Sequence, residues 1–98
     1  MPLFAIICTD KPREGLELRK ANRERHLQWL ADLGDVVKAA GPFLDDEGNP
    51  AGSLIIIKAN SMEEAAAIAG QDPYRAAGVF ESVDIRPWKW LIGRPEQA

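Results

Sequence analysis

The order of elements in this chain is clearest at residues 53–64, which read SLIIIKANSMEE. The four consecutive large apolar residues, LIII, are typical of a strand that is covered on both faces. The letters SMEE match the capping box S-x-x-E, in which the serine and glutamate side chains satisfy backbone N–H groups at the start of a helix. The segment therefore predicts a strand over residues 53–59 followed by a helix over residues 62–69.

A second strand and helix are expected at the N-terminal end. Residues 3–9, LFAIICT, are apolar at nearly every position and predict another strand that is covered on both faces. After a loop that contains Pro and Gly, residues 16–33 place apolar residues at helical spacing, on the side of the helix that also carries His26. Gly34 is expected to end this helix in a left-handed conformation.

Two further strands complete the pattern. Residues 36–40 predict a short strand, and the turn-forming sequence DDEGNPAG at residues 45–52 separates it from the next strand. Residues 72–74, DPY, predict a tight connection, and residues 80–91 predict the last and longest strand. The order βαββαβ is that of a ferredoxin-like α+β fold, in which two helices cover one face of a four-stranded antiparallel sheet.

The apolar strands at residues 3–9 and 53–59 raise the question of what covers their second face, since the helices can cover only one. In a monomer that face would be an apolar patch larger than ordinary monomer surfaces carry. The chain has 98 residues, of which 46% are hydrophobic, and one domain over residues 1–98 has little interior for them. The sequence therefore predicts a homodimer in which two sheets pack together as a dimeric α+β barrel.

Composition argues against several other classes of protein. The 12 basic and 15 acidic residues give a net charge of -3, and the arginines of the first helix alternate with glutamates rather than forming a basic face for nucleic acid. One Cys and one His do not make a zinc site, and no Gly-rich phosphate loop is present, so neither a metal nor an organic cofactor is expected. The apolar run at residues 3–8 is too short for a signal peptide or a membrane span. We expect a cytoplasmic protein that binds neither nucleic acid nor membranes.

His26 and Asp72 are the best candidates for chemistry. Imidazole suits proton transfer near neutral pH, and a carboxylate beside it can fix its tautomer and stabilise its charged form. The alternative for His26 is a core histidine with satisfied hydrogen bonds, and the alternative for Asp72 is an aspartate that caps the turn before a proline. Spacing alone leaves both alternatives open.

Four more residues are expected to contact a substrate. Arg19 and Arg23 precede His26 by seven and three positions on the first helix, and guanidinium groups bind carboxylates in bidentate fashion. A solvent-exposed role is the alternative for both arginines. Ser53 and Tyr74 offer hydroxyl groups.

Taken together, the sequence resembles the YCII-related (YciI-like) family in the order and spacing of six short strings. They lie between about residue 3 and residue 92 and read FAII (4–7), RKANRERHL (19–27), AGP (40–42), GSL (52–54), DPY (72–74) and IRPW (85–88). The resemblance implies a dimeric ferredoxin-like α+β barrel with a cleft that holds a His–Asp dyad. It also implies that the family's histidine corresponds to His26, its aspartate to Asp72 and its upstream arginine to Arg23.

The resemblance does not select a substrate or a reaction. One activity in the family is the dehydrochlorination of a chlorinated hydroxyquinol, and related dimeric barrels include muconolactone isomerases and cofactor-free monooxygenases. The expected function is therefore that of a lyase or isomerase in which His26 and Asp72 transfer a proton on a small anionic or phenolic compound. A non-catalytic ligand-binding or interaction domain with the same cleft is the alternative.

Overall fold

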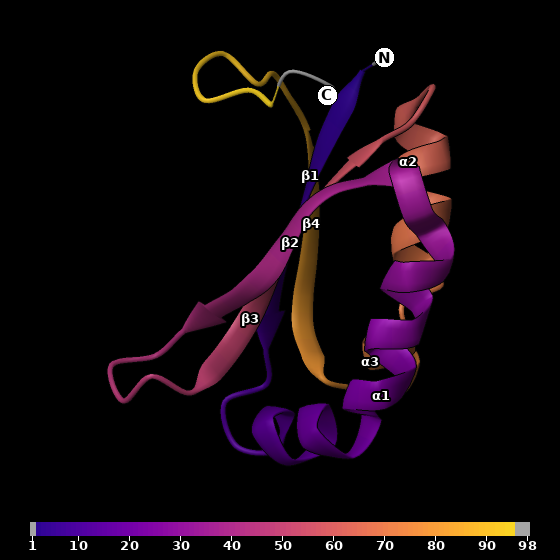
Figure 1. Cartoon of the computed structure of the whole chain (residues 1–98). Coiled ribbons are helices and arrows are strands. Elements are labelled where there is room, and N and C mark those ends of the chain that lie inside the picture. The colour runs from indigo at the N-terminus through magenta and orange to yellow at the C-terminus, as the bar shows by residue number, and fades with distance from the viewer. Residues whose placement is uncertain (1, 96–98) are drawn as a thin grey trace.

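The computed structural model describes residues 2–95 of the chain. Its elements are β1 (Leu3–Asp10), α1 (Gly15–Leu33), the 3-10 helix η1 (Gly34–Val36), β2 (Val37–Leu44), β3 (Pro50–Lys58), α2 (Met62–Gly70), α3 (Pro73–Ala76) and β4 (Phe80–Trp88). The strands form one antiparallel sheet in the order β2-β3-β1-β4. The helices all lie on one face of this sheet (Figure 1), which confirms the predicted ferredoxin-like α+β fold.

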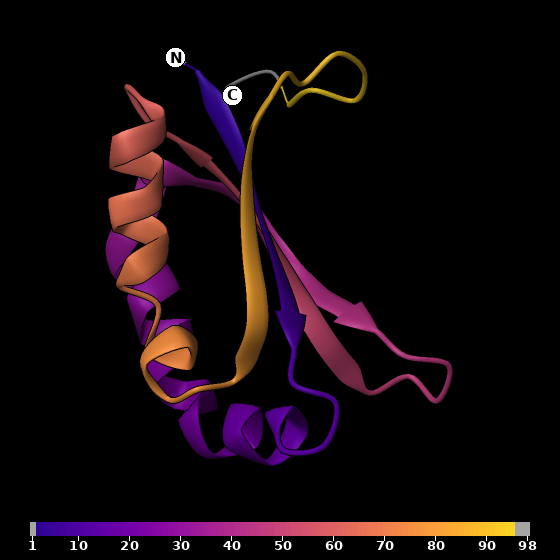
Figure 2. The ribbon, with the colours of Figure 1, turned by 180° about the vertical axis from the view of Figure 1, so that it is seen from behind.

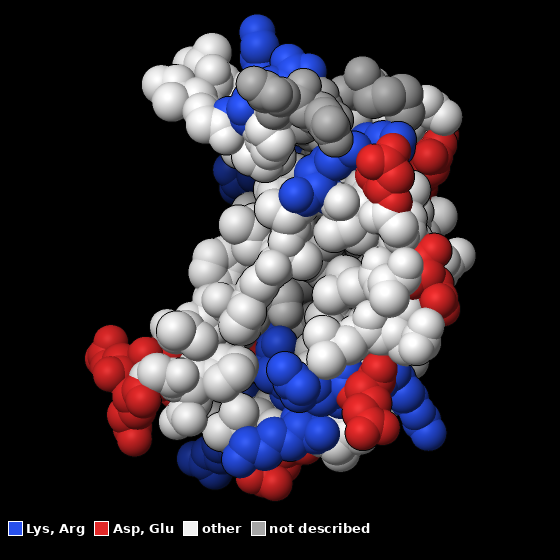
Figure 3. Space-filling view, viewed as in Figure 1, with Lys and Arg blue, Asp and Glu red and all other residues white. Residues whose placement is uncertain are grey.

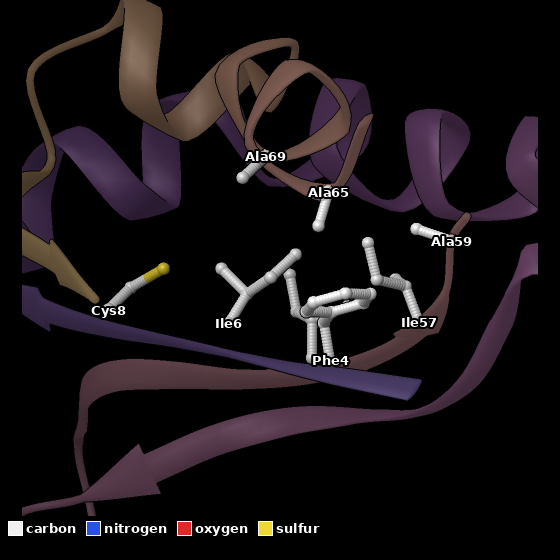
Figure 4. Close-up of a cluster of buried hydrophobic side chains, with 8 residues drawn as sticks. Phe4, Ile6, Cys8, Ile57, Ala59, Ala65 and Ala69 are labelled. Carbon is white, nitrogen blue, oxygen red and sulfur yellow. The ribbon is translucent and has the colours of Figure 1, made fainter. Parts of the chain in front are cut away.

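The hydrophobic core lies between α2 and the inner face of the two central strands. Phe4, Ile6 and Cys8 alternate along β1 and point toward Ala65 and Ala69 of α2 (Figure 4). The two alanines are small, so α2 packs closely against the strand. The residues paired with the β1 side chains across the sheet are also buried: Ile57, Ile55 and Ser53.

Both helix boundaries that the sequence predicted from capping signals are confirmed. The Ser61 hydroxyl accepts the backbone N–H of Glu64 at 3.1 Å, which is the serine half of the capping box. α1 ends at Leu33 as predicted, and Gly34 follows with a positive φ of 56°, but its ψ of -123° lies outside the left-handed helical region that was expected. The chain then continues through η1 before it enters β2, a turn that the sequence did not predict.

The β2–β3 hairpin differs from the sequence prediction. β2 continues to Leu44 rather than ending at Ala40, and β3 begins at Pro50, so the turn is shorter than expected. β2 is an edge strand, and an edge tolerates Pro42 because one side of the strand has no ladder to join. The Asp45 carboxylate closes the turn by accepting two backbone N–H groups at 2.9 Å.

No helix of the described residues covers the face of the sheet turned away from α1, α2 and α3 (Figure 2). Phe43 of β2 and Trp88 of β4 remain 43% and 39% exposed, and β4 ends at Trp88 rather than at the predicted residue 91. The two-sided apolar character of β1 and β3 is confirmed, while the homodimer stays a prediction. The other apolar residues of this face are the half-buried Leu3, Ile7 and Leu54 and the buried Ala5 and Ile56.

Candidate active site

A cavity of about 420 Å³ lies between α1 and the part of the sheet formed by β2 and β3. Its apolar walls include Leu16, Leu27, Leu30, Pro42, Pro50 and Ile55. Its polar and charged lining consists mainly of residues that the sequence singled out, namely Arg19, Arg23, His26, Ser53 and Tyr74, together with Lys20. In the space-filling view, Lys and Arg side chains gather at one end of the hollow between the sheet and the helices (Figure 3).

The structure brings His26 and Asp72 together. His26 Nδ1 lies 2.9 Å from Asp72 Oδ1, and the two side chains are only 9% and 3% exposed. His26 belongs to α1, and Asp72 lies at the start of α3, which packs against α1. Because a carboxylate only accepts hydrogen bonds, the neutral imidazole carries its proton on Nδ1 and keeps a lone pair on Nε2.

Asp72 has a second partner. Its Oδ1 also accepts the backbone N–H of Tyr74 at 2.9 Å, which makes it the N-cap of α3, with Pro73 in the first turn. Within residues 2–95, Oδ2 of the same carboxylate is buried without a hydrogen-bond partner. The capping alternative is therefore confirmed, and it does not exclude a role beside His26 because the same oxygen atom reaches both groups.

The imidazole of His26 is held on one face as well as on one nitrogen. The Tyr74 ring stacks on it, with the ring centroids 3.9 Å apart and the planes within 6° of parallel. Trp29 approaches from another side, at 5.9 Å between centroids and with a tilt of 42°. No hydrogen bond from residues 2–95 reaches Nε2, and the residue lines the cavity, so Nε2 is the atom available to a ligand.

Arg19 forms a buried ion pair with a residue that the sequence analysis did not single out. Its Nε and Nη2 atoms donate to the two carboxylate oxygens of Asp10 at 2.9 and 2.8 Å, and Nη2 also donates to the Ser53 hydroxyl at 3.0 Å. Burial disfavours the charge of Arg19, but the Asp10 carboxylate outweighs that effect and holds the arginine's pKa above its ordinary value. The only signal for Asp10 in the sequence was an acidic residue directly after an apolar strand.

Within residues 2–95, the cavity has a lining without Asp or Glu, but the buried Asp10 carboxylate neutralises the charge of Arg19 in its wall. Arg23 and Lys20 are exposed at its edge, whereas Arg19 is buried in its wall. Burial raises the pKa of the Tyr74 hydroxyl, and the positive charges of Arg19 and Arg23 act in the opposite direction. The predicted substrate contacts of these residues and of Ser53 stay predictions, although all of them line the same cavity.

Cys8 lies in the core rather than in the cavity wall. It is a free, buried thiol, and burial raises its pKa to about 12, with a further contribution from the negative charge of Asp72. Among the residues that the structure describes, no group of three His, Cys, Asp or Glu side chains is placed to bind a metal ion. In the same part of the chain, no helix is both long and apolar enough to cross a membrane.

Comparison with known proteins identifies relatives that match over most of their length. A family model described as a YCII-related domain matches residues 2–89. Protein YciI of Escherichia coli O6:H1 is 38% identical over 95 residues, which cover 89% of this chain and 96% of that protein. A Haemophilus influenzae protein is 36% identical over 95 residues, with 88% and 95% of the two chains covered.

Two solved structures are similar to this chain in fold. The 5-chloro-2-hydroxyhydroquinone dehydrochlorinase of Burkholderia phenoliruptrix, solved with 2,5-dihydroxybenzoquinone, has a TM-score of 0.80 and 32% identity over 89% of this chain and 93% of that chain. A NIPSNAP family protein of Agrobacterium tumefaciens has a TM-score of 0.57 at 18% identity over 97% of each chain, and it shares the fold alone. By the family model and the identity of its relatives, the chain belongs to the family of YCII-related domains.

Proposed function

We propose that this protein is a cofactor-independent lyase or isomerase that transfers a proton on a small anionic or phenolic compound. The observation that carries the proposal is the 2.9 Å contact between His26 Nδ1 and Asp72 Oδ1 beside a cavity of about 420 Å³. A carboxylate on Nδ1 holds the ring in one tautomer and stabilises the imidazolium that forms when Nε2 takes a proton. His26 is the proposed general acid–base, and Asp72 is its orienting partner.

The proposed chemistry begins with transfer of a proton from a substrate hydroxyl or C–H group to Nε2 of His26. In an isomerisation, the imidazolium returns that proton to a different atom of the substrate. In a dehydrochlorination of a chlorinated hydroquinone, the proton of one hydroxyl group is returned to the carbon that bears chlorine, which gives the keto tautomer. Chloride then leaves with its bonding electrons, a hydroxyl proton is lost to the base, and the net products are a quinone, one chloride ion and one proton.

The cavity suits a small flat anion. Its volume lies near the lower end of the range for small-molecule sites, its walls are apolar and its charged side chains are cationic. The similar dehydrochlorinase was solved with 2,5-dihydroxybenzoquinone, a single flat ring with oxygen substituents. We propose that Arg23 binds a negative oxygen of the substrate at the edge of the cavity, with Arg19, Ser53 and Tyr74 as further contacts.

Turnover assays test the enzymatic proposal. The wild-type protein is incubated with 5-chloro-2-hydroxyhydroquinone and with a panel of small phenolic and lactone acids, and chloride release and ultraviolet absorbance are followed. We expect turnover of at least one compound, and a loss of about 10²-fold or more in His26→Ala, the usual scale for general acid–base catalysis. Tight binding of these compounds without any turnover would contradict the enzyme and support a ligand-binding domain with the same cleft.

Two arginines on one helix provide a matched test of substrate binding. Arg23 lines the cavity, whereas Arg25 is also exposed on α1 but lies outside the cavity lining. Loss of one charge-assisted hydrogen bond predicts an increase in KM of about 10-fold or more for Arg23→Ala, with a smaller effect on kcat. Arg25→Ala should leave KM unchanged, and equal effects of the two substitutions would contradict the proposed contact.

A further inference from the structure

The ring of Tyr74 has no role in the proton transfer proposed above, yet it makes the closest ring contact of the site. One of its faces is covered by the parallel imidazole of His26, with centroids 3.9 Å apart. The guanidinium carbon of Arg19 lies 4.7 Å from the centroid of the same tyrosine ring. A stacked imidazole leaves no room for a guanidinium on its own side at these distances, so Arg19 occupies the opposite face.

The spacing of these residues on α1 fits that arrangement. Arg19 and His26 are seven residues apart, which separates their backbones by about 10 Å along the helix. The tyrosine ring fills the space between the two side chains and is itself only 2% exposed. Its backbone N–H donates to Asp72, and Phe80 meets its ring edge-on at 6.1 Å. The ring is therefore fixed from its backbone, its edge and both faces.

The charges of the stack favour an imidazolium at His26. The face of an aromatic ring attracts a cation, so the Tyr74 ring stabilises the protonated imidazole in addition to Asp72. A guanidinium without a carboxylate partner on the far face of Tyr74 would destabilise the imidazolium of His26 by repulsion between like charges. The two hydrogen bonds from Arg19 to Asp10 place a carboxylate against the guanidinium, so the buried pair carries no net charge. Arg19 therefore supports the ring without adding net positive charge beside His26.

We propose that Tyr74 is a positioning residue whose ring, supported by the Arg19–Asp10 pair, holds the plane of the His26 imidazole. In that plane Nδ1 stays on Asp72 and Nε2 faces the cavity. This inference rests on the proposed function, because it concerns the same histidine. It differs from the predicted substrate contact of the Tyr74 hydroxyl, since the ring alone is sufficient for positioning.

Nitrogen-15 NMR of the histidine side chain tests the inference on the full chain without any ligand. His26 is the only histidine, so labelled histidine gives the signals of one imidazole. At a pH where the ring is neutral, we expect the wild type and Tyr74→Phe to show the tautomer protonated on Nδ1. We also expect ring protons shifted upfield by the stacked aromatic ring. Tyr74→Leu should show a mixture of tautomers and lose the upfield shift.

A wild-type spectrum without the upfield shift would overturn the inference, and so would a Tyr74→Phe spectrum that resembles that of Tyr74→Leu. If Tyr74→Leu does not fold, the wild-type spectrum and the flexible Tyr74→Met substitution decide the question. A single retained tautomer in the folded Leu or Met variant would also overturn it. Because the measurement uses no substrate, an absence of turnover would contradict the proposed function while leaving this spectrum unaffected.

Discussion

One oxygen atom of Asp72 both caps α3 and contacts His26, and substitutions at this position can separate the two contributions. Oδ1 accepts the backbone N–H of Tyr74 and lies 2.9 Å from His26 Nδ1. An asparagine in this position keeps an oxygen that can cap α3, but it lacks the negative charge that stabilises an imidazolium. An alanine removes both the cap and the partner of His26. The structural and the proposed catalytic contributions of Asp72 therefore differ between these two substitutions.

Thermal and denaturant unfolding of the Asp72 variants give the first prediction. Asp72→Ala should lower the free energy of unfolding by about 1 kcal/mol more than Asp72→Asn, which is the typical worth of an N-cap. Asp72→Asn should lose activity while it retains most of its stability. Equal destabilisation by the two substitutions would show that the cap contributes nothing.

Cys8 gives a prediction about alkaline pH. Burial raises the thiol pKa from 9.0 to about 12, so the folded state holds its proton more tightly than the unfolded state does. Its contribution to stability is therefore complete below pH 9 and is lost as the pH rises toward 12. We expect the free energy of unfolding to fall over this window. The decrease should be smaller in Cys8→Ala, and equal slopes for the two proteins would contradict the role of the thiol.

The sequence could predict His26 and Asp72 as candidates because a single histidine on a helix and an aspartate before a proline are visible as local patterns. It could not predict that Arg19 is buried, since a run of mixed charges on a helix is usually solvated. The reason for its burial is Asp10, which lies on a different element and was expected to belong to a loop. Such pairs depend on tertiary contacts, and one sequence shows no sign of them.

At the scale of elements, α1 is unusual in what it buries. Its buried residues are Gly15, Arg19 and His26, while Leu27 is 44% exposed on the side that lines the cavity. An ordinary surface helix buries its apolar stripe and exposes its polar groups. Here the cavity separates part of the stripe from the sheet, and polar side chains fill the remaining contacts. The helix therefore contributes a site at the expense of ordinary packing.

The close contact of Gly52 in β3 with the neighbouring strands β1 and β2 gives a prediction at the scale of elements. A Cβ atom at Gly52 of β3 would lie 2.4 Å from the carbonyl oxygen of Cys8 and 3.2 Å from the Phe43 ring. A backbone oxygen in a central strand cannot move away cheaply, so Gly52→Ala should destabilise the fold by about 1–3 kcal/mol. Gly41→Ala in β2 is the matched control, since a Cβ there meets nothing within 4 Å. Equal unfolding free energies for the two variants would contradict the close approach of Gly52 to the backbone of β1.

The strand boundaries show where local pattern stops being informative. The sequence ended the second strand at Ala40 because Gly41 and Pro42 usually break strands, but the edge position of β2 tolerates both. It extended the last strand to residue 91 because the apolar residues continue, yet the pairing with β1 ends at Trp88. Strand length is set by the length of the partner strand, which is a property of the sheet.

At the scale of the whole molecule, the face of the sheet turned away from the helices supports the predicted homodimer. Light scattering at micromolar concentration should give a mass near twice the 10.8 kDa of the chain. Ile7→Glu places a charge at the centre of this face and should shift the protein toward monomer. Ala67→Glu places the same charge on the exposed side of α2 and should leave the mass unchanged. A wild-type monomer would contradict the dimer.

The central claim, that His26 and Asp72 act as one catalytic unit, is tested most directly by a double-mutant cycle on turnover. Residues that act as a unit lose activity in a strongly non-additive way. His26→Ala should reduce turnover by about 10²-fold or more, and Asp72→Asn by a similar order of magnitude. The double mutant should be little worse than His26→Ala alone. Additive losses, or melting temperatures that fall while the folded fraction keeps normal specific activity, would contradict the claim.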